Sequence, residues 1–347
     1  MKHIKDFSLK ELEEYVAGSG QPKYRAKEIF SGIYKEKRKN FSEITTLPKE
    51  YRKELAEQFN ISTFEKLSEI KSTDETTKYV FKLKDNSLIE SVLIRKENKY
   101  RRKMSTLCIS TQVGCPLECK FCATGRMGFK RNLATSEIIE QFLVVEEETP
   151  LSNIVYMGMG EPLLNYENTK KSVEILSDIH GRNFGRRRIT ISTAGIVDKI
   201  YRLSDEIKSV TLAISLHTAS QAKRNKLMPG LSRFPIRELL KALKYYVRTT
   251  GNTITIEYLL INNFNDSQED ADNLIEFAKE IKFVKINLIS LNELPFMNYR
   301  KSTRESEFEK YLLNKNLRAT LRKSKGTDIS AACGQLATNI PSTQKST

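Results

Sequence analysis

The spacing of apolar and polar positions divides the chain into regions of different secondary structure. Up to about residue 60, apolar residues recur at helical spacing in three short segments. Ser8 and Glu11 form a capping box before the first helix, at 9–16, and the second helix covers 24–35. Pro48 begins the third helix. We expect these helices to form a small N-terminal unit.

Between about residues 65 and 95 the period changes to two. Strands at 78–84 and 88–94 flank a turn at 85–87, which predicts a β-hairpin. Glu90 is an acidic residue inside the second of these apolar strands. Most such residues face water on the outer side of a sheet, so the position alone does not assign it a function.

After about residue 105, apolar strands alternate with amphipathic helices. The expected strands lie at 107–110, 153–157, 188–193, 210–216, 253–261 and 284–291, with a shorter seventh at 318–322. The expected helices lie at 135–148, 168–179, 235–247, 266–281 and 304–314. Apolar strands joined by crossover helices are typical of a parallel sheet, and about six strands rather than eight predict an open, partial βα barrel.

The predicted fold class is therefore α/β, with four segments along the chain. Residues 1–62 form an N-terminal helical accessory domain, and residues 63–104 form a short β-hairpin linker. Residues 105–338 form the partial βα barrel, and the polar residues 339–347 form a loose tail.

Length and composition restrict the class of protein further. A chain of 347 residues with 39% hydrophobic residues can build a barrel-sized domain and a small appendage. It has no run of eighteen apolar residues and no secretory leader, so we expect a cytoplasmic protein without membrane contact. Five cysteines fit metal or redox chemistry in a reducing compartment better than a disulfide framework. The oligomeric state cannot be read from these patterns.

The charge balance indicates a polyanionic partner. The chain has 58 Lys and Arg residues against 43 Asp and Glu, which gives a net charge of +15. Basic residues cluster at 35–39, 96–103 and 186–188, and Tyr100 offers a stacking face for loop or single-stranded RNA. The alternative is a general excess of lysine on solvated helix faces. We expect the accessory domain to contact RNA.

Three cysteines lie close together in the loop after the first barrel strand. Cys115, Cys119 and Cys122 have C-x3-C-x2-C spacing, and no fourth cysteine is nearby. A [4Fe–4S] cluster takes one thiolate per iron, so three thiolates leave one iron open. The alternatives are buried structural cysteines or a zinc site with His217 as the fourth ligand, as in a zinc-stabilised RNA-binding protein without catalysis. The chain lacks the second C-x2-C pair that zinc sites usually have.

Distinctive residues follow the carboxyl ends of the other predicted strands, which converge on one pocket in βα barrels. They are Gly160, Glu161, Ser192, Ser215, Leu216, His217 and Asn292. For each one alone, a turn, cap or structural role is an equally good or better interpretation. Cys108, on the first barrel strand, and Cys333, in a small polar stretch, are the other two cysteines and suggest paired thiol chemistry.

The cysteine loop, with Phe121 before its last cysteine, resembles the cluster motif of the radical S-adenosylmethionine (SAM) enzymes. With Gly158–Asn165, Ser215–His217 and Asp328–Gln335, the chain resembles the RlmN-type family of radical SAM adenine C2-methyltransferases. That resemblance implies a [4Fe–4S] cluster held by Cys115, Cys119 and Cys122. It also implies a SAM site at the strand-end residues named above and two SAM molecules per turnover.

The resemblance implies 23S rRNA and tRNA, next to the anticodon, as substrates, and flavodoxin or ferredoxin as a reducing partner. One SAM methylates Cys333, and a 5′-deoxyadenosyl radical from a second SAM activates that methyl group to add to adenine C2. Glu90 matches the position of the proposed proton acceptor. Cys108 then attacks Cys333, which resolves the RNA–protein adduct and leaves a disulfide.

One segment departs from the family pattern. After Asn292 the family usually has a loop with Pro and Gly, whereas this chain has Glu293–Tyr299. Related enzymes methylate C8 of the same rRNA adenosine, so a C8-directed activity is the alternative. The motif Pro162–Asn165 favours methylation of C2 over methylation of C8.

Overall fold

The computed structural model describes residues 2–97 and 103–337. The expected tail at 339–347, Tyr100 and most of the basic cluster at 96–103 lie outside these residues. No helix in the described part of the chain is long and apolar enough to cross a bilayer.

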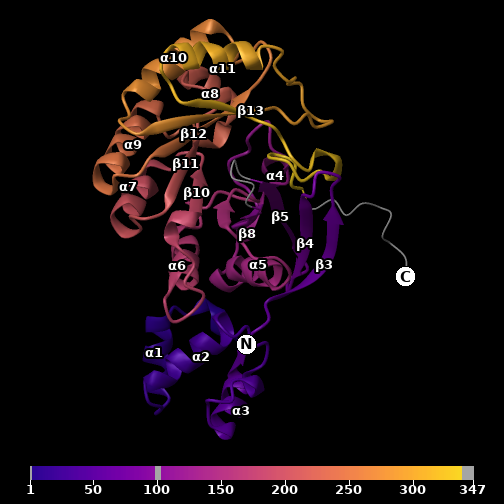
Figure 1. The fold of residues 1–347 in the computed structure, drawn as a ribbon, viewed down its shortest axis with the longest axis vertical. Helices are drawn as coiled ribbons and strands as arrows, with labels where there is room; N and C mark the ends of the chain where they lie inside the picture. The colour runs from indigo at the N-terminus through magenta and orange to yellow at the C-terminus, as the bar shows by residue number, and fades with distance from the viewer. Residues whose placement is uncertain (1, 98–102, 338–347) are drawn as a thin grey trace.

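The N-terminal unit contains the three expected helices. They are α1 (Leu9–Gly18), α2 (Tyr24–Tyr34) and α3 (Lys49–Gln58), and the capping box of Ser8 and Glu11 is present. Buried apolar side chains from all three helices pack together, and the short strands β1 (Lys2–His3) and β2 (Phe59–Asn60) pair in parallel. The unit, coloured indigo in Figure 1, lies at one end of the elongated molecule.

One mixed sheet forms the rest of the framework. Its parallel strands are β6 (Lys103–Cys108), β9 (Asn153–Tyr156), β10 (Ile189–Thr193), β11 (Thr211–Ser215), β12 (Ile254–Leu260), β13 (Val284–Ser290) and β14 (Ala319–Arg322). They are adjacent in sequence order, from β6 at one side to β14 at the other. Within the described residues, β3 and β14 are the two edges of this sheet, so the barrel is open as predicted, and the short seventh strand is confirmed.

The antiparallel strands β3 (Phe64–Lys71), β4 (Thr77–Leu83) and β5 (Leu88–Glu97) continue the same sheet beyond β6. We expected two of them as a hairpin linking two domains. Instead, β5 pairs with the barrel strand β6 along its length, so this segment is part of the sheet that carries the site.

Helices connect the parallel strands and cover the sheet (Figure 1). They are α5 (Thr135–Glu148), α6 (Tyr166–Ser177), α7 (Val197–Glu206), α8 (Gln221–Leu227), α9 (Ile236–Thr250), α10 (Gln268–Lys279) and α11 (Glu305–Asn314). The sequence analysis did not predict α7 and α8. Both are short, and their buried apolar residues are only Ile200 and Leu203 on α7 and Leu227 on α8.

Ion pairs attach the N-terminal unit to α5. Lys5 and Glu140 form a buried pair, and the Lys39 ammonium lies 2.8 Å from a Glu147 carboxylate oxygen. Lys37 also approaches Glu146, at 3.5 Å. Two lysines of the basic cluster at 35–39 therefore contribute to the junction within the chain.

Candidate active site

The three-cysteine loop leaves the sheet after β6 and returns before α5, and its two ends are held together. The Leu133 amide donates to the Thr111 carbonyl at 3.0 Å. The Asn165 side-chain amide donates to both of these residues' carbonyl oxygens, each at 2.8 Å. Asn165 ends the Gly158–Asn165 motif, so this motif supports the base of the cysteine loop.

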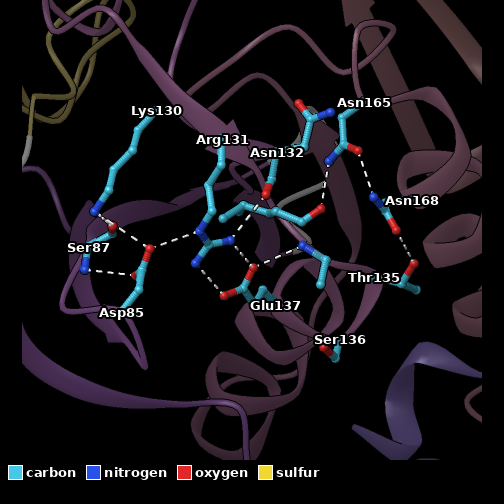
Figure 2. A network of polar contacts seen from close by, with 12 residues as sticks. Asp85, Ser87, Lys130, Arg131, Asn132, Thr135, Ser136, Glu137, Asn165 and Asn168 are labelled. Carbon is cyan, nitrogen blue, oxygen red and sulfur yellow. Dashed lines mark hydrogen bonds and ion pairs between the residues drawn. The ribbon is translucent and has the colours of Figure 1, made fainter. Parts of the chain in front are cut away.

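A polar network fixes the hairpin of β7 (Gln112–Gly114) and β8 (Phe129–Asn132), which flanks the cysteines. Figure 2 shows Arg131 between two carboxylates, with Asp85 at 2.9 Å and Glu137 at 2.7 Å. Lys130 donates to Ser87 Oγ at 2.5 Å. These contacts join the β4–β5 turn and the start of α5 to the hairpin, so the cysteine loop has a rigid frame.

Two other segments contact the cysteine loop through backbone hydrogen bonds. The Lys120 amide donates to Leu227 at 2.9 Å, and the Gly230 amide donates to Leu117 at 3.1 Å. From the other segment, Gly334 accepts from the Ala123 amide at 2.7 Å. The loop therefore lies between the end of α8 and the segment that contains Cys333.

The three thiols of the loop form one group. Burial, with a smaller contribution from a charge on Cys122, raises the pKa of the Cys115 thiol to about 12. Burial also raises the pKa of the Cys119 thiol, and charges on Cys122 and Cys115 act in the same direction. Burial raises the pKa of Cys122 as well, although the backbone amides of Gly125 and Thr124 act in the opposite direction. Three thiols that influence one another's charge lie close together, as the ligands of one cluster must.

One contact of His217 argues against the zinc alternative. Its Nδ1 accepts a hydrogen bond from the Leu259 amide at 3.1 Å, which leaves the proton on Nε2, whereas a zinc ligand needs an unprotonated ring nitrogen.

His217 faces the cysteine loop as a neutral ring. Its backbone is left-handed, with φ of +59°, and its imidazole lies edge-on to Phe121, with 4.8 Å between ring centroids. Burial lowers the pKa of His217 to about 3. Because Nδ1 accepts a hydrogen bond, the proton is on Nε2, which can donate to a ligand.

The Gly158–Glu161 turn packs against the chain that enters the cysteine loop. A Cβ on Gly158 would lie 2.7 Å from the Ile109 backbone, and one on Gly160, where φ is +98°, would lie 2.5 Å from the Gln112 side chain. Glu161 is buried, and its carboxylate accepts from the amides of Leu163 at 2.9 Å and Ala194 at 2.8 Å. Burial raises the pKa of Glu161 to about 7. The carboxylate thus joins two strand-end loops.

The remaining strand-end residues lie on neighbouring strands. Ser192 is near the end of β10 and Ser215 is the last residue of β11. Leu216 is buried, and its amide donates to the Glu257 carbonyl at 3.1 Å. Asn292 follows β13, and its side-chain amide donates to the Cys333 carbonyl at 3.0 Å. The structure therefore brings these residues to the same edge of the sheet as the cysteine loop.

Cys108 and Cys333 also meet at this edge. Cys108 ends β6 and is 8% exposed, and burial followed by the charge of Cys333 raises the pKa of its thiol. Cys333 is reached by solvent, yet the protein around it raises its thiol pKa. The charge of Cys122 also acts on Cys333. The two spare thiols are thus near each other and near the three-cysteine loop.

Three polar residues near Cys333 were missed by the sequence analysis. Glu257 on β12 accepts from Asn287 at 3.0 Å and lies 3.8 Å from the Arg322 guanidinium. The charges of Arg322 and Glu257 both act on Cys333. Glu257 is a single acid in an otherwise apolar strand, which is the signal that singled out Glu90 and could have identified it as well.

Comparisons with known families agree with this arrangement. Residues 109–278 match the Radical SAM superfamily. Residues 2–61 match the family described as Ribosomal RNA large subunit methyltransferase N-terminal domain. The two matches cover the N-terminal unit and most of the parallel part of the sheet.

Individual relatives match along nearly the whole chain. A probable dual-specificity RNA methyltransferase RlmN from Thermotoga maritima is 46% identical over 341 residues, which are 97% of each chain. A dual-specificity RNA methyltransferase RlmN from Geotalea uraniireducens is 42% identical over 335 residues, which are 96% of each chain. The crystal structure of a radical SAM methyltransferase from Sphaerobacter thermophilus is 40% identical, with a TM-score of 0.89, and covers 97% of this chain and 99% of that one.

Proposed function

We propose that this chain, which belongs to the RlmN family of radical SAM RNA methyltransferases, forms 2-methyladenosine in 23S rRNA and in tRNA. Membership implies a [4Fe–4S] cluster and SAM as cofactors. The proposal goes further in naming the carbon that is methylated, the two RNA substrates, and the residues that act.

The observation that carries the proposal is the convergence of cysteines that are far apart in the sequence. Cys108 lies within electrostatic range of Cys333, and Cys333 lies within range of Cys122. Hydrogen bonds from Asn292 and Ala123 hold the segment around Cys333 beside the cysteine loop. A thiol in this position could receive a methyl group close to the cofactors and be reached by a second thiol.

When bound, the cofactors supply the methyl group from one SAM and a 5′-deoxyadenosyl radical from a second. We assign the cluster to Cys115, Cys119 and Cys122. We assign SAM binding to the residues at the strand ends, which are Gly160, Glu161, Ser192, Ser215, Leu216, His217 and Asn292.

The remaining chemistry belongs to three side chains. Cys333 Sγ accepts the methyl group, which would lose one hydrogen atom to the 5′-deoxyadenosyl radical so that its carbon can bond to adenine C2. Glu90 takes the proton that C2 loses, and the one electron left over from the radical addition would be taken up by the oxidised cluster. Cys108 Sγ then attacks Cys333 Sγ, so an S–S bond forms and the bond from Cys333 to carbon breaks. The electron pair of that bond stays on the carbon, which takes up a proton to become the methyl group. A flavodoxin or ferredoxin supplies the electrons that restore the thiols.

Basic residues of the N-terminal unit support the proposal that the substrate is RNA. A cavity of about 560 Å³ lies beside α3, and its lining includes Lys39, Lys49, Arg52 and Lys53. Ammonium and guanidinium groups in a recess suit phosphate groups of a nucleic acid backbone. We propose that residues 1–62 contact RNA outside the target nucleotide.

Nucleoside mass spectrometry tests the proposed function. Ribosomal RNA and tRNA are isolated separately from a strain lacking the gene and from the same strain complemented with it. We expect 2-methyladenosine to disappear from both pools and to return on complementation. An unchanged nucleoside profile would overturn the proposal, and loss of 8-methyladenosine instead would favour the C8 alternative.

A further inference from the structure

A buried lysine lies next to the proposed proton acceptor. Lys78 is on β4 and is 3% exposed, and Glu90 is on β5 and is 1% exposed. We infer that Lys78 is a positioning residue that holds the Glu90 carboxylate ionised and directed at the carbon carried by Cys333. This inference rests on the proposed function and extends it to a residue with no role assigned above.

The register of the strands puts these groups on one face of the sheet. Lys78 pairs with Val92, and Val92 pairs with Cys108 on the next strand. Glu90 lies two residues before Val92, so its side chain has the same orientation. Lys78, Glu90 and Cys108 therefore share the face on which the spare thiols meet.

The segment that contains Cys333 contacts both members of the pair. The Lys78 ammonium lies 3.5 Å from Glu90 Oε1 and 3.5 Å from the Ser330 carbonyl oxygen. The Ala337 amide donates to Glu90 Oε2 at 3.1 Å. Ser330 and Ala337 lie on either side of Cys333 in the chain. The pair thus fixes both flanks of the segment that delivers the reacting carbon.

A lysine at this position has a chemical consequence for Glu90. Burial alone favours the protonated form of a carboxyl group, which cannot act as a base. A neighbouring ammonium favours the carboxylate. The hydrogen bond from Ala337 to Oε2 restricts the carboxylate further and links it to the segment that contains Cys333.

The step that depends on this pair is a simple proton transfer. In the adduct formed by radical addition at C2, the C2–H bond breaks, its proton goes to a Glu90 carboxylate oxygen, its electron pair restores the ring, and the one surplus electron would be taken up by the oxidised cluster. Glu90 becomes neutral, and Lys78 keeps its proton. A positioned general base typically contributes 10²–10⁴-fold to a rate, so loss of its positioning is expected to cost about 10–100-fold.

The experiment follows two steps separately in Lys78→Met. Methyl transfer to Cys333, measured by peptide mass spectrometry without RNA, should stay within about twofold of wild type, because it does not use Glu90. The rate of 2-methyladenosine formation should fall about 10–100-fold. RNA deuterated at adenine C2 should also show a larger isotope effect with the variant than with wild type, because removal of the C2 proton has become slower.

Two variants serve as references. Lys78→Arg keeps a cation and should recover part of the rate. Lys82→Met removes an exposed lysine from the same strand and should leave the rate unchanged. The inference is overturned if Lys78→Met turns over at the wild-type rate, or if it lowers Cys333 methylation and product formation equally with no change in the isotope effect. If wild type itself forms no 2-methyladenosine, the proposed function fails, and this result is known before any variant is made.

Discussion

Two buried cations in different parts of the molecule are neutralised in different ways. Lys78, on the antiparallel strand β4, has the Glu90 carboxylate 3.5 Å from its ammonium. Arg224, on α8 beside the parallel strands, donates to the backbone carbonyls of Leu216 at 2.7 Å and Ser215 at 3.3 Å, and to that of Ala194. Among the described residues it has no acidic partner within ion-pair distance.

This difference separates the parallel part of the sheet from the antiparallel part by the way each stabilises a buried cation. A buried cation without an anion is costly, and burial lowers the pKa of Arg224 to about 10. A charge on Cys119 acts in the opposite direction, so this thiol of the cysteine loop lies within electrostatic range of Arg224. Lys78 instead has the Glu90 carboxylate beside it. The parallel part therefore holds its buried cation with backbone carbonyls, whereas the antiparallel part holds its buried cation with a carboxylate.

The largest expected effect comes from removing Cys333, whose segment contacts both the cysteine loop and the Lys78–Glu90 pair. Cys333→Ala should lower 2-methyladenosine formation by at least about 10³-fold, as loss of a covalent nucleophile typically does. Iron content should stay at the wild-type level, because Cys333 is not one of the three loop cysteines. Product is measured by nucleoside mass spectrometry and iron by colorimetric assay.

Cys108→Ala is the matched variant for that prediction. It should still accept a methyl group on Cys333 but should not release methylated RNA. Full turnover by either variant would show that the spare thiols are not part of the reaction.

The next effect tests the parallel part alone. Arg224→Met leaves buried carbonyls of Leu216 and Ala194 without their donor, which should lower the free energy of unfolding by about 2–4 kcal/mol. Urea unfolding followed by circular dichroism measures this difference. Lys226→Met, an exposed position on the same helix, is the control and should have almost no effect. Equal urea midpoints for Arg224→Met and Lys226→Met would show that the hydrogen bonds of Arg224 to backbone carbonyls do not stabilise the fold.

A smaller effect is expected where the Gly158–Glu161 turn meets the cysteine loop. Gly160→Ala imposes a Cβ at φ of +98°, 2.5 Å from the Gln112 side chain, and should destabilise the fold by about 1–3 kcal/mol. Gly185→Ala is the control, since nothing lies within 4 Å of its Cβ position. A stable Gly160→Ala protein would mean that the turn can move away from the loop.

The smallest effect compares two buried carboxylates. Glu161 accepts from the backbone amides of Leu163 and Ala194, whereas Glu90 lies beside Lys78 and also accepts from the Ala337 amide. Burial raises the pKa of Glu161 to about 7 from its ordinary value of 4.5. The folded state therefore binds this proton more tightly than the unfolded chain. The resulting stability is fully present below about pH 4.5 and is lost as the pH rises through 7.

Glu161→Gln should remove that pH dependence, a difference on the order of 1–2 kcal/mol between pH 5 and 8. Urea midpoints of both proteins without cofactors, taken across this range, provide the measurement. Parallel curves for the two proteins would show that Glu161 does not titrate there.

The sequence predicted the parallel part better than the antiparallel part, for a physical reason. Polar residues at strand ends, such as Ser215 and Asn292, stand apart from the apolar strands before them, and carboxyl ends of parallel strands converge by geometry. Lys78 and Glu90 instead lie within strands of period two, where a polar residue normally faces water. Their burial depends on the segment around Cys333, whose contacts with them join residues 252 and 247 positions apart in the chain.

The same reasoning explains the missed Glu257 but not the missed α7. Glu257 lies inside an apolar strand, and only the approach of Arg322 from β14 reveals its partner. The α7 helix has a clear apolar stripe on one face, so its helical period was present in the sequence and was overlooked. The strand β3 was overlooked because most of its side chains are exposed or half-buried and carry little apolar pattern.

The most direct test of the account follows one methyl group. The protein is loaded with SAM carrying an isotopically labelled methyl group, excess SAM is removed, and RNA is added with unlabelled SAM and a reductant. We expect the label first on the peptide that contains Cys333 and then, in a single turnover, on adenine C2. Label that reaches RNA without ever appearing on Cys333, or that never leaves Cys333 while unlabelled product forms, would contradict the central claim.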